Sequence, residues 1–209
     1  MRILVVAATA LEIGPFLGND NGVDHLITGV GAAACVYQLQ KKLQLQPYDL
    51  IIQAGIAGSF TNELALGETV LVQKEVFADL GIFEKGSFTT LFDLGLADRD
   101  AYPYQQGWLV NNHPLLSKYH LPGVAAASVN SLSDSPATSA LFLDKFRVDI
   151  ESMEGAAFHY TCLQEKVPFL QLRSISNRVG ERDKENWTMK DAITNLNKEL
   201  QALITHCSI

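Results

Sequence analysis

The sequence lacks the features that mark several large classes of protein. Its 209 residues include only three cysteines, Cys35, Cys162 and Cys207, which are far apart and form no CxxC pair and no Cys/His cluster. That spacing predicts small buried hydrophobic residues, one of them near a frayed terminus, and neither a disulfide framework nor a metal site. No apolar run reaches the roughly 18 residues that a membrane-spanning helix needs, and residues 1–10 are not followed by a signal-peptide cleavage region. We therefore expect a cytoplasmic protein with no metal or organic cofactor and no membrane partner.

Basic residues are scarce as well. The chain has 16 Lys and Arg against 23 Asp and Glu, which gives a formal net charge of −7. Proteins that bind nucleic acid neutralise phosphates with clustered Lys and Arg, so this balance argues against such a partner. Before residue 99 the only arginine is Arg2, at the start of the first predicted strand. The early loops therefore offer no arginine to a phosphate group.

The sequence does contain a regular alternation of apolar runs and helical patterns. Hydrophobic residues make up 47% and charged residues 19%, as in an ordinary globular protein, and the length suits a single domain spanning residues 1–209. Short continuous apolar runs predict strands that are covered on both faces. They span residues 3–8, 24–30, 49–54, 69–79, 123–129, 148–150 and 169–176.

Helical patterns separate these runs at residues 32–45, 137–146, 153–165 and 187–204. Shorter helical stretches are predicted at residues 9–13, stopped by Gly14-Pro15, and at residues 114–119. The alternation predicts an α/β fold: a three-layer single domain with a curled, central mixed sheet flanked by helices.

Residues 80–107 do not fit this alternation. They hold many Gly, Asp and aromatic residues with no sustained period. A long irregular segment inside a compact domain is usually functional or disordered, so we expect an excursion over a ligand pocket. Within it, Tyr102-Pro103-Tyr104 suits either a lid or surface packing.

Polar residues gather where the predicted strands end, which is where ligands bind in α/β sheets. These positions are Glu12, Gly55 to Ser59, Glu151 to Glu154, and Arg173 to Arg178. They predict the walls of one pocket. Taken singly, Glu12 also suits a first-turn acid that complements a helix dipole. The glycine-rich segment is predicted to form a turn after the strand at residues 49–54, which suits either close approach of its N–H groups to a ligand or simply a tight turn.

A GxGxxA pattern at residues 29–34 argues little for a dinucleotide site. It does not follow the first strand, and no acidic ribose anchor stands about twenty residues further on. An NAD-binding protein is therefore disfavoured.

The order and spacing of four segments resemble the purine nucleoside phosphorylase and nucleosidase superfamily over nearly the whole chain. The segments are Glu12, Gly55-Ile56-Ala57-Gly58, Ser152-Met153-Glu154-Gly155-Ala156 and Arg173-Ser174-Ile175-Ser176-Asn177. Residues 151–157 and 175–187 are most similar to the futalosine hydrolases of menaquinone biosynthesis. The methylthioadenosine/adenosylhomocysteine nucleosidases look like relatives. They have Glu-Met-Glu where this chain has Ser152-Met153-Glu154, and Asp where this chain has Asn177. The resemblance implies a nucleoside phosphorylase-like fold, a homo-oligomer and a small-molecule purine nucleoside as substrate.

The resemblance also implies roles for particular residues. Glu12 would activate water, Glu154 would bind the ribose hydroxyls, and Asn177 would face the purine. The implied substrate-binding residues are Ala57, Gly58, Leu132, Ser152, Met153 and Ser176. An amide cannot deliver a proton to the departing base; it can only donate and accept hydrogen bonds. We therefore expect Asn177 to hydrogen-bond to hypoxanthine, the base released from futalosine.

Some alternatives stay open. Asp183 is a possible replacement acid, and Arg173 and Arg178 suit structural partners of acids. Phosphorolysis would need an anion pocket, which the early loops do not supply. A further alternative is a module that binds nucleosides without turning them over. The presence of Glu12 and Glu154 argues against it.

Overall fold

The computed structural model describes residues 1–18, 22–132, 135–181 and 183–207. Its main strands are β1 (Ile3–Ala7), β2 (Asp24–Ile27), β3 (Leu50–Ser59), β4 (Thr69–Phe77), β7 (Leu109–Val110), β8 (Gly123–Ser128), β9 (Ile150–Ser152) and β10 (Phe169–Arg178). The helices are α1 (Gly14–Leu17), α2 (Ala32–Leu43), α3 (Pro136–Phe146), α4 (Gly155–Gln164) and α5 (Met189–Cys207), with single 3-10 turns at η1 (Pro114–Ser117) and η2 (Lys184–Asn186).

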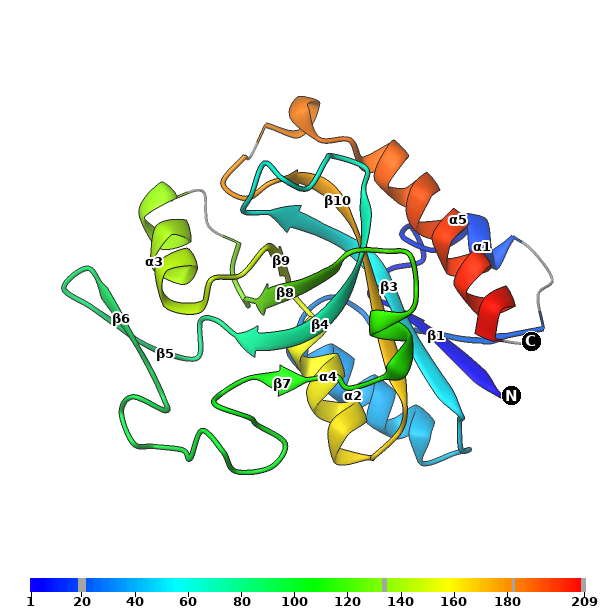
Figure 1. Ribbon diagram of the computed structural model, residues 1–209, viewed down its shortest axis with the longest axis horizontal. Helices are drawn as coiled ribbons and strands as arrows, with labels where there is room; N and C mark the ends of the chain where they lie inside the picture. The colour runs from blue at the N-terminus through cyan, green and yellow to red at the C-terminus, as the bar shows by residue number, and fades with distance from the viewer. Residues whose placement is uncertain (19–21, 133–134, 182, 208–209) are drawn as a thin grey trace.

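The main sheet curls until it closes on itself (Figure 1). β3 pairs with β10 along one edge, and along the other edge it pairs first with β1 and then with β9. β9 pairs with β8, β8 with β4, and β4 with β10, which completes the ring. The ring contains both parallel pairs, such as β3–β10, and antiparallel pairs, such as β4–β10. The predicted curled, mixed sheet is confirmed.

The first strand shows why the apolar runs are continuous. Ile3 and Val5 pack into a core shared with α5, whereas Leu4 and Val6 pack into a core shared with α2 and α4. Successive side chains of a strand point to opposite faces, so a strand covered on both faces has no polar alternation. Figure 1 shows α5 and α1 on one side of the sheet and α2 and α4 on the other. The three-layer prediction is confirmed.

Two local predictions are wrong. Gly14-Pro15 begins helix α1 and does not stop one, because proline suits the first turn, where its missing N–H would have no partner. Residues 55–59 continue strand β3 and make no turn there. The reason for glycine at residue 55 lies in the tertiary structure and is given with the site below.

The expected excursion does not cover the pocket of its own chain, because none of the described residues that line the site cavity lies between residues 80 and 107. Residues 81–90 form a hairpin of β5 (Gly81–Glu84) and β6 (Ser87–Thr90). The hairpin projects at the left of Figure 1, on the side of the molecule away from α5. Phe88 packs edge-on against Phe142 of α3, with ring centroids 5.9 Å apart. Tyr104 packs against Tyr160 of α4 at 6.1 Å. Within the chain, the Tyr102 to Tyr104 stretch packs on the surface of α4.

The cysteines behave as small hydrophobic residues. Cys35 and Cys162 are fully buried in the core between α2 and α4, and Cys207 is partly exposed near the end of α5. Burial raises the pKa of the Cys35 thiol to about 12, so it stays protonated. In the described ranges no His, Cys, Asp and Glu side chains cluster as a metal site would require. No helix there is long and apolar enough to span a membrane.

Candidate active site

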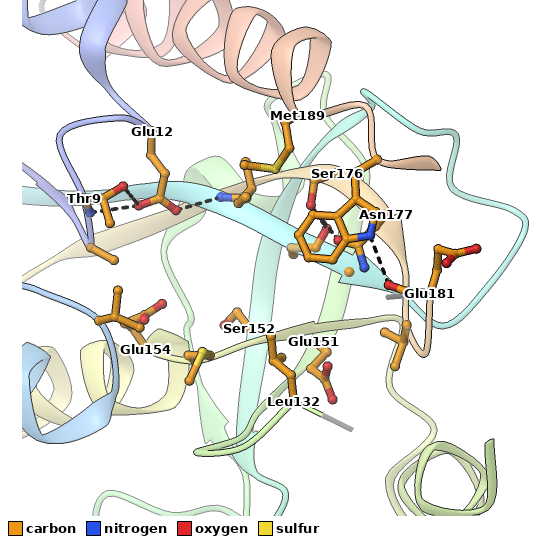
Figure 2. Close-up of a pocket in the computed structure, with 18 of the residues that line it drawn as sticks. Thr9, Glu12, Leu132, Glu151, Ser152, Glu154, Ser176, Asn177, Glu181 and Met189 are labelled. Atoms are coloured by element: carbon orange, nitrogen blue, oxygen red, sulfur yellow. Dashed lines mark hydrogen bonds between the residues drawn. The ribbon is translucent and has the colours of Figure 1, made fainter. Parts of the chain in front are cut away.

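A cavity of about 280 Å³ lies at the carboxyl ends of β1, β3 and β10, where β9 meets α4. Its size is close to the lower end of the range for small-molecule sites. The residues predicted from the sequence as site residues all line it: Glu12, Ala57, Gly58, Leu132, Ser152, Met153, Glu154, Ser176 and Asn177. In Figure 2, Glu12 and Glu154 lie at one end, which we call the acidic end, and Asn177 lies toward the other.

Glu12 is held by the main chain of two strand ends. One carboxylate oxygen, Oε2, accepts hydrogen bonds from the N–H and the hydroxyl of Thr9, at 2.9 and 3.0 Å. The other, Oε1, accepts from the N–H of Ile56 at 3.2 Å. The Asn197 amide of α5 donates to the Glu12 carbonyl at 2.8 Å. These donors orient a side chain that is only 7% exposed, which is the preorganisation a general base needs.

Glu154 lies across the cavity from Glu12 (Figure 2). It precedes α4 directly and is 4% exposed. Its Oε1 accepts a hydrogen bond from the N–H of Gly31 at 2.8 Å. Gly31 has φ of +94°, a conformation that favours glycine. The glycines at residues 29–31 therefore position Glu154 and need no dinucleotide to explain them.

Arg173 is the cation behind the acidic end. Its guanidinium is almost fully buried and lies 3.8 Å from the Glu154 carboxylate. It also donates to Oε1 of Gln53 at 3.1 Å. The prediction that Arg173 is a partner of an acid is confirmed. Arg178, by contrast, donates to the main-chain carbonyls of Thr61 and Leu64.

Gly55 makes this arrangement possible. A Cβ on residue 55 would lie 2.3 Å from Nη1 of Arg173 and 2.8 Å from Oε1 of Glu12. Both distances are far below ordinary contact, so a side chain there would displace the cation and the acid together. The glycine predicted to form a turn instead lets two charged side chains approach the strand.

Asn177 forms the opposite end of the cavity with Ser176. The Ser176 hydroxyl donates to Oδ1 of Asn177 at 2.8 Å, and Nδ2 of Asn177 donates to the Arg178 carbonyl at 2.8 Å. These bonds define which end of the amide is the oxygen. One N–H and one oxygen lone pair of the amide remain for a ligand.

The remaining predicted residues form the floor and rim. Ala57 and Gly58 are the last cavity-lining residues of β3, and a Cβ on Gly58 would lie 3.3 Å from Nδ2 of Asn177. Ser152 is buried at the end of β9, and its hydroxyl accepts from the Gly155 N–H at 3.4 Å. Met153 is partly exposed beside it, and Leu132 is 39% exposed at the rim.

Sequence reasoning misplaced one acid. Asp183 caps the short η2 turn by accepting from the Glu185 N–H at 3.0 Å and does not line the cavity. Glu181 lines it instead, and its carbonyl accepts from the Trp187 indole N–H at 3.0 Å. Trp187 and Met189 were predicted as part of the closing helix, and both line the cavity. Trp187 lies just before α5, and Met189 is its first residue.

Other lining residues carried only a weak signal in the sequence. Thr9 and Leu11 follow the first strand, Val30 lies within the GxGxxA pattern, and Glu151 adjoins the Ser152-Met153-Glu154 segment. Asn130, which follows strand β8, does not line the cavity. Its main-chain N–H donates to the Asp79 carboxylate at 2.6 Å on the surface. Each of these placements depends on tertiary packing.

The fold and the cavity define an α/β protein with one enclosed acidic end and one amide end, suited to a small polar molecule. Residues 21–208 match the family model described as the phosphorylase superfamily. The chain belongs to this superfamily, and the resemblance seen in its sequence is confirmed.

The relatives agree with that membership, and a solved structure agrees with the fold. The chain is 29% identical to a futalosine hydrolase of Thermus thermophilus, over 96% of this chain and 94% of the relative. It is 25% identical to a 5′-methylthioadenosine/S-adenosylhomocysteine nucleosidase of Marinomonas sp., over 98% and 89%. In fold it matches the native structure of futalosine hydrolase of Helicobacter pylori with a TM-score of 0.80, at 16% identity, over 99% and 98% of the two chains.

Proposed function

We propose that this protein is a nucleosidase that hydrolyses the N-ribosidic bond of futalosine and releases hypoxanthine. The observation that carries the proposal is the acidic end of the cavity, which the buried side chains of Glu12 and Glu154 both border. The futalosine hydrolase relative, which aligns with nearly the whole chain, supports the choice of substrate. The protein is accordingly an enzyme that cleaves N-glycosidic bonds.

The reaction passes through a sugar with the character of an oxocarbenium ion. The oxygen of water forms a bond to C1′, while the C1′–N9 bond breaks and leaves its electron pair on the purine. Glu12 accepts the proton that water loses, and the purine takes up a proton from solvent. General base assistance of this kind contributes roughly 10²–10⁴ in rate.

Glu154 would accept hydrogen bonds from the ribose hydroxyls. Its negative charge would also stabilise the developing sugar cation, since electrostatic interactions are strong in a site shielded from water. Arg173 holds this carboxylate from behind and leaves its other side open to the cavity. Met153 would pack on the sugar, next to Ser152.

Asn177 would bind the base. Its free N–H donates to an acceptor on the purine, and its oxygen accepts from a ring N–H, as on hypoxanthine. Hypoxanthine is a better leaving group than adenine, so the lack of a general acid here costs less. Ala57, Gly58, Ser176 and Leu132 would enclose the purine.

Water is favoured over phosphate as the acceptor. Among the described residues that line the cavity, none is Arg or Lys. A phosphate would therefore meet Glu12 and Glu154 with no facing cation, which is unfavourable. Incubating the protein with futalosine, with and without phosphate, distinguishes hydrolysis from phosphorolysis by the sugar product.

The substrate is tested by offering futalosine, aminodeoxyfutalosine, methylthioadenosine and inosine in parallel and identifying the released base. Hypoxanthine released fastest from futalosine supports the proposal. Preference for methylthioadenosine supports the alternative, a methylthioadenosine-type nucleosidase. The similarity to the Marinomonas relative is the observation that favours this alternative. A tight complex with no free purine after long incubation would identify a nucleoside-binding module.

We also propose that the protein is a homo-oligomer. An apolar groove runs along α2 and is lined by residues that include Ala33, Val36, Tyr37 and Phe77. Tyr37 is 63% exposed there, and exposed apolar patches of this kind mark interaction surfaces. Sedimentation equilibrium measures the mass in solution, and Tyr37→Glu is expected to shift it toward that of the monomer.

A further inference from the structure

A further buried carboxylate, Glu75, lies behind the acidic end of the cavity. It stands on β4, is 0% exposed and does not line the cavity. Its Oε1 accepts a hydrogen bond from the Gln171 amide at 2.9 Å, and its Oε2 accepts from the Ser128 hydroxyl at 3.0 Å. An acid buried in the centre of a sheet is costly unless it is held by such partners. The reaction proposed above does not use it.

Ser128 connects Glu75 to the main chain of α4. Its hydroxyl proton points to Glu75, while its oxygen accepts from the Ala156 N–H at 2.7 Å. This N–H belongs to the first turn of α4, where such groups have no partner within the helix. Glu75 therefore sets the orientation of the hydroxyl that caps this turn.

Gly155 brings Glu75 into direct contact with the same turn. A Cβ on residue 155 would lie 1.7 Å from Oε1 of Glu75 and 2.5 Å from Nε2 of Gln171. The carboxylate thus presses on the main chain of the residue that follows Glu154. Through Ser128 and Gly155, it touches the corner between β9 and α4 at two points.

We propose that Glu75 is a positioning residue for the ribose: it fixes the β9–α4 corner, residues 152–156, and so holds Glu154 where the sugar hydroxyls bind. The proposal rests on the function proposed above. Positioning errors of about 1 Å can cost on the order of 10²-fold in rate. Glu75 acts on the reaction only through Glu154.

The surroundings allow Glu75 to act whether it is charged or neutral. Burial raises the pKa of its carboxyl to about 7, and Gln171 and Arg173 oppose that shift. Within the described part of the chain, Oε1 of Gln171 and Nε2 of His159 have no hydrogen-bond partner. Rotating the Gln171 amide would let its oxygen accept a proton from neutral Glu75. Oε2 would still accept from Ser128.

His159 suits the rotated orientation of that amide. Its Nδ1 lies 3.1 Å from the Leu109 carbonyl. Burial lowers the pKa of the imidazole to about 4, while the Leu109 carbonyl and the Gln171 amide oppose that shift. The neutral ring therefore carries its proton on Nδ1 and offers Nε2 as an acceptor. The rotated amide would direct its N–H groups toward this nitrogen.

The test measures discrimination between futalosine and its 2′-deoxy analogue, as the ratio of kcat/KM values. Comparing this ratio between proteins cancels the different intrinsic reactivity of the two sugars. Glu75→Ala is expected to lower the ratio about tenfold, mostly through kcat. The reason is that a misplaced Glu154 would no longer accept a hydrogen bond from the 2′-hydroxyl of the ribose. Glu75→Gln keeps the size of the side chain. Once the Gln171 amide has rotated, the new amide can donate to Oε1 of Gln171 and still accept from Ser128, so the ratio is expected to stay within about threefold of the wild type.

Thr161→Ala is the matched control. Thr161 is also buried on α4 and donates to the Ala157 carbonyl at 2.9 Å, within the helix and just beyond the corner residues. It should cost stability without changing the ratio. If Glu75→Ala does not fold, Ser128→Ala carries the same expected loss.

Three outcomes separate the possible failures. A folded Glu75→Ala or Ser128→Ala enzyme with the wild-type ratio overturns the positioning role. So does a Glu75→Gln enzyme as impaired as Glu75→Ala, since charge would then matter more than position. A wild-type protein that releases no purine from any nucleoside refutes the proposed function itself.

Discussion

The guanidinium of Arg173 lies 3.8 Å from the carboxylate of Glu154, with only 2% and 6% of the two side chains exposed. Removing one member of a buried pair leaves the other charge uncompensated. Arg173→Ala is therefore expected to lower the free energy of unfolding by about 3–5 kcal/mol, measured by urea denaturation.

The control for this change is an exposed ion pair. Arg99 lies 3.3 Å from Asp93, and its side chain is 53% exposed. Arg99→Ala should cost less than about 1 kcal/mol. Equal losses from the two variants would show that burial does not determine the contribution of Arg173.

Replacement of Glu12 tests the proposed general base. Glu12→Gln keeps the shape of the side chain but cannot accept a proton at neutral pH. We expect kcat to fall by roughly 10²–10⁴ with a small change in KM, measured by release of the base. Glu63→Gln, an exposed acid outside the cavity, should leave both constants unchanged. A Glu12→Gln enzyme with full kcat would remove Glu12 from the mechanism.

Asn177 is the proposed determinant of base preference. Asn177→Asp replaces the amide with a group that can carry a proton to the purine or accept from an amino group. The ratio of kcat/KM for hypoxanthine over adenine nucleosides is expected to fall by at least about tenfold. If the ratio does not move, Asn177 does not select the base.

Much of the fold is predictable because its strands are covered on both faces. Residues 3–8 form a continuous apolar run, since Val5 and Val6 each meet a separate helical layer. The segment at residues 55–59 is mispredicted for a different reason. Glycine serves both turns and close contacts, and only the folded chain shows Arg173 and Glu12 converging on Gly55.

The site divides in the same way. Glu12, Glu154 and Asn177 stand at strand ends, where position along the chain already suggests a ligand. Glu75 gives no such signal, because it is one acid within a long strand. Its partners Ser128 and Gln171 lie 53 and 96 residues away, so its role follows from the three-dimensional contacts alone.

Gly55→Ala tests the close approach on β3. The added methyl group would meet both Arg173 and Glu12, and such overpacking typically costs about 1–3 kcal/mol. Activity should fall further than stability implies, because the general base is displaced. Gly14→Ala is the control, since a Cβ there meets nothing within 4 Å. A Gly55→Ala enzyme with normal stability and kcat would contradict the geometry.

The pH dependence of stability reports on Glu75. Burial raises the pKa of its carboxyl from the ordinary 4.5 to about 7. Between these values the folded state holds a proton that the unfolded state has lost, so stability falls as pH rises through this window. Above pH 7 the penalty is complete. Its upper limit is about 3 kcal/mol.

His159 acts in the opposite direction. Burial lowers the pKa of its imidazole from 6.5 to about 4, so the unfolded state binds the extra proton and stability falls as pH drops through that range. The two effects partly cancel between about pH 4.5 and 6.5 in the wild type. Glu75→Gln removes only the first. The stability of this variant relative to the wild type should therefore rise from pH 5 to pH 8, measured as urea midpoints. A difference that stays constant with pH would mean that Glu75 does not titrate in this range.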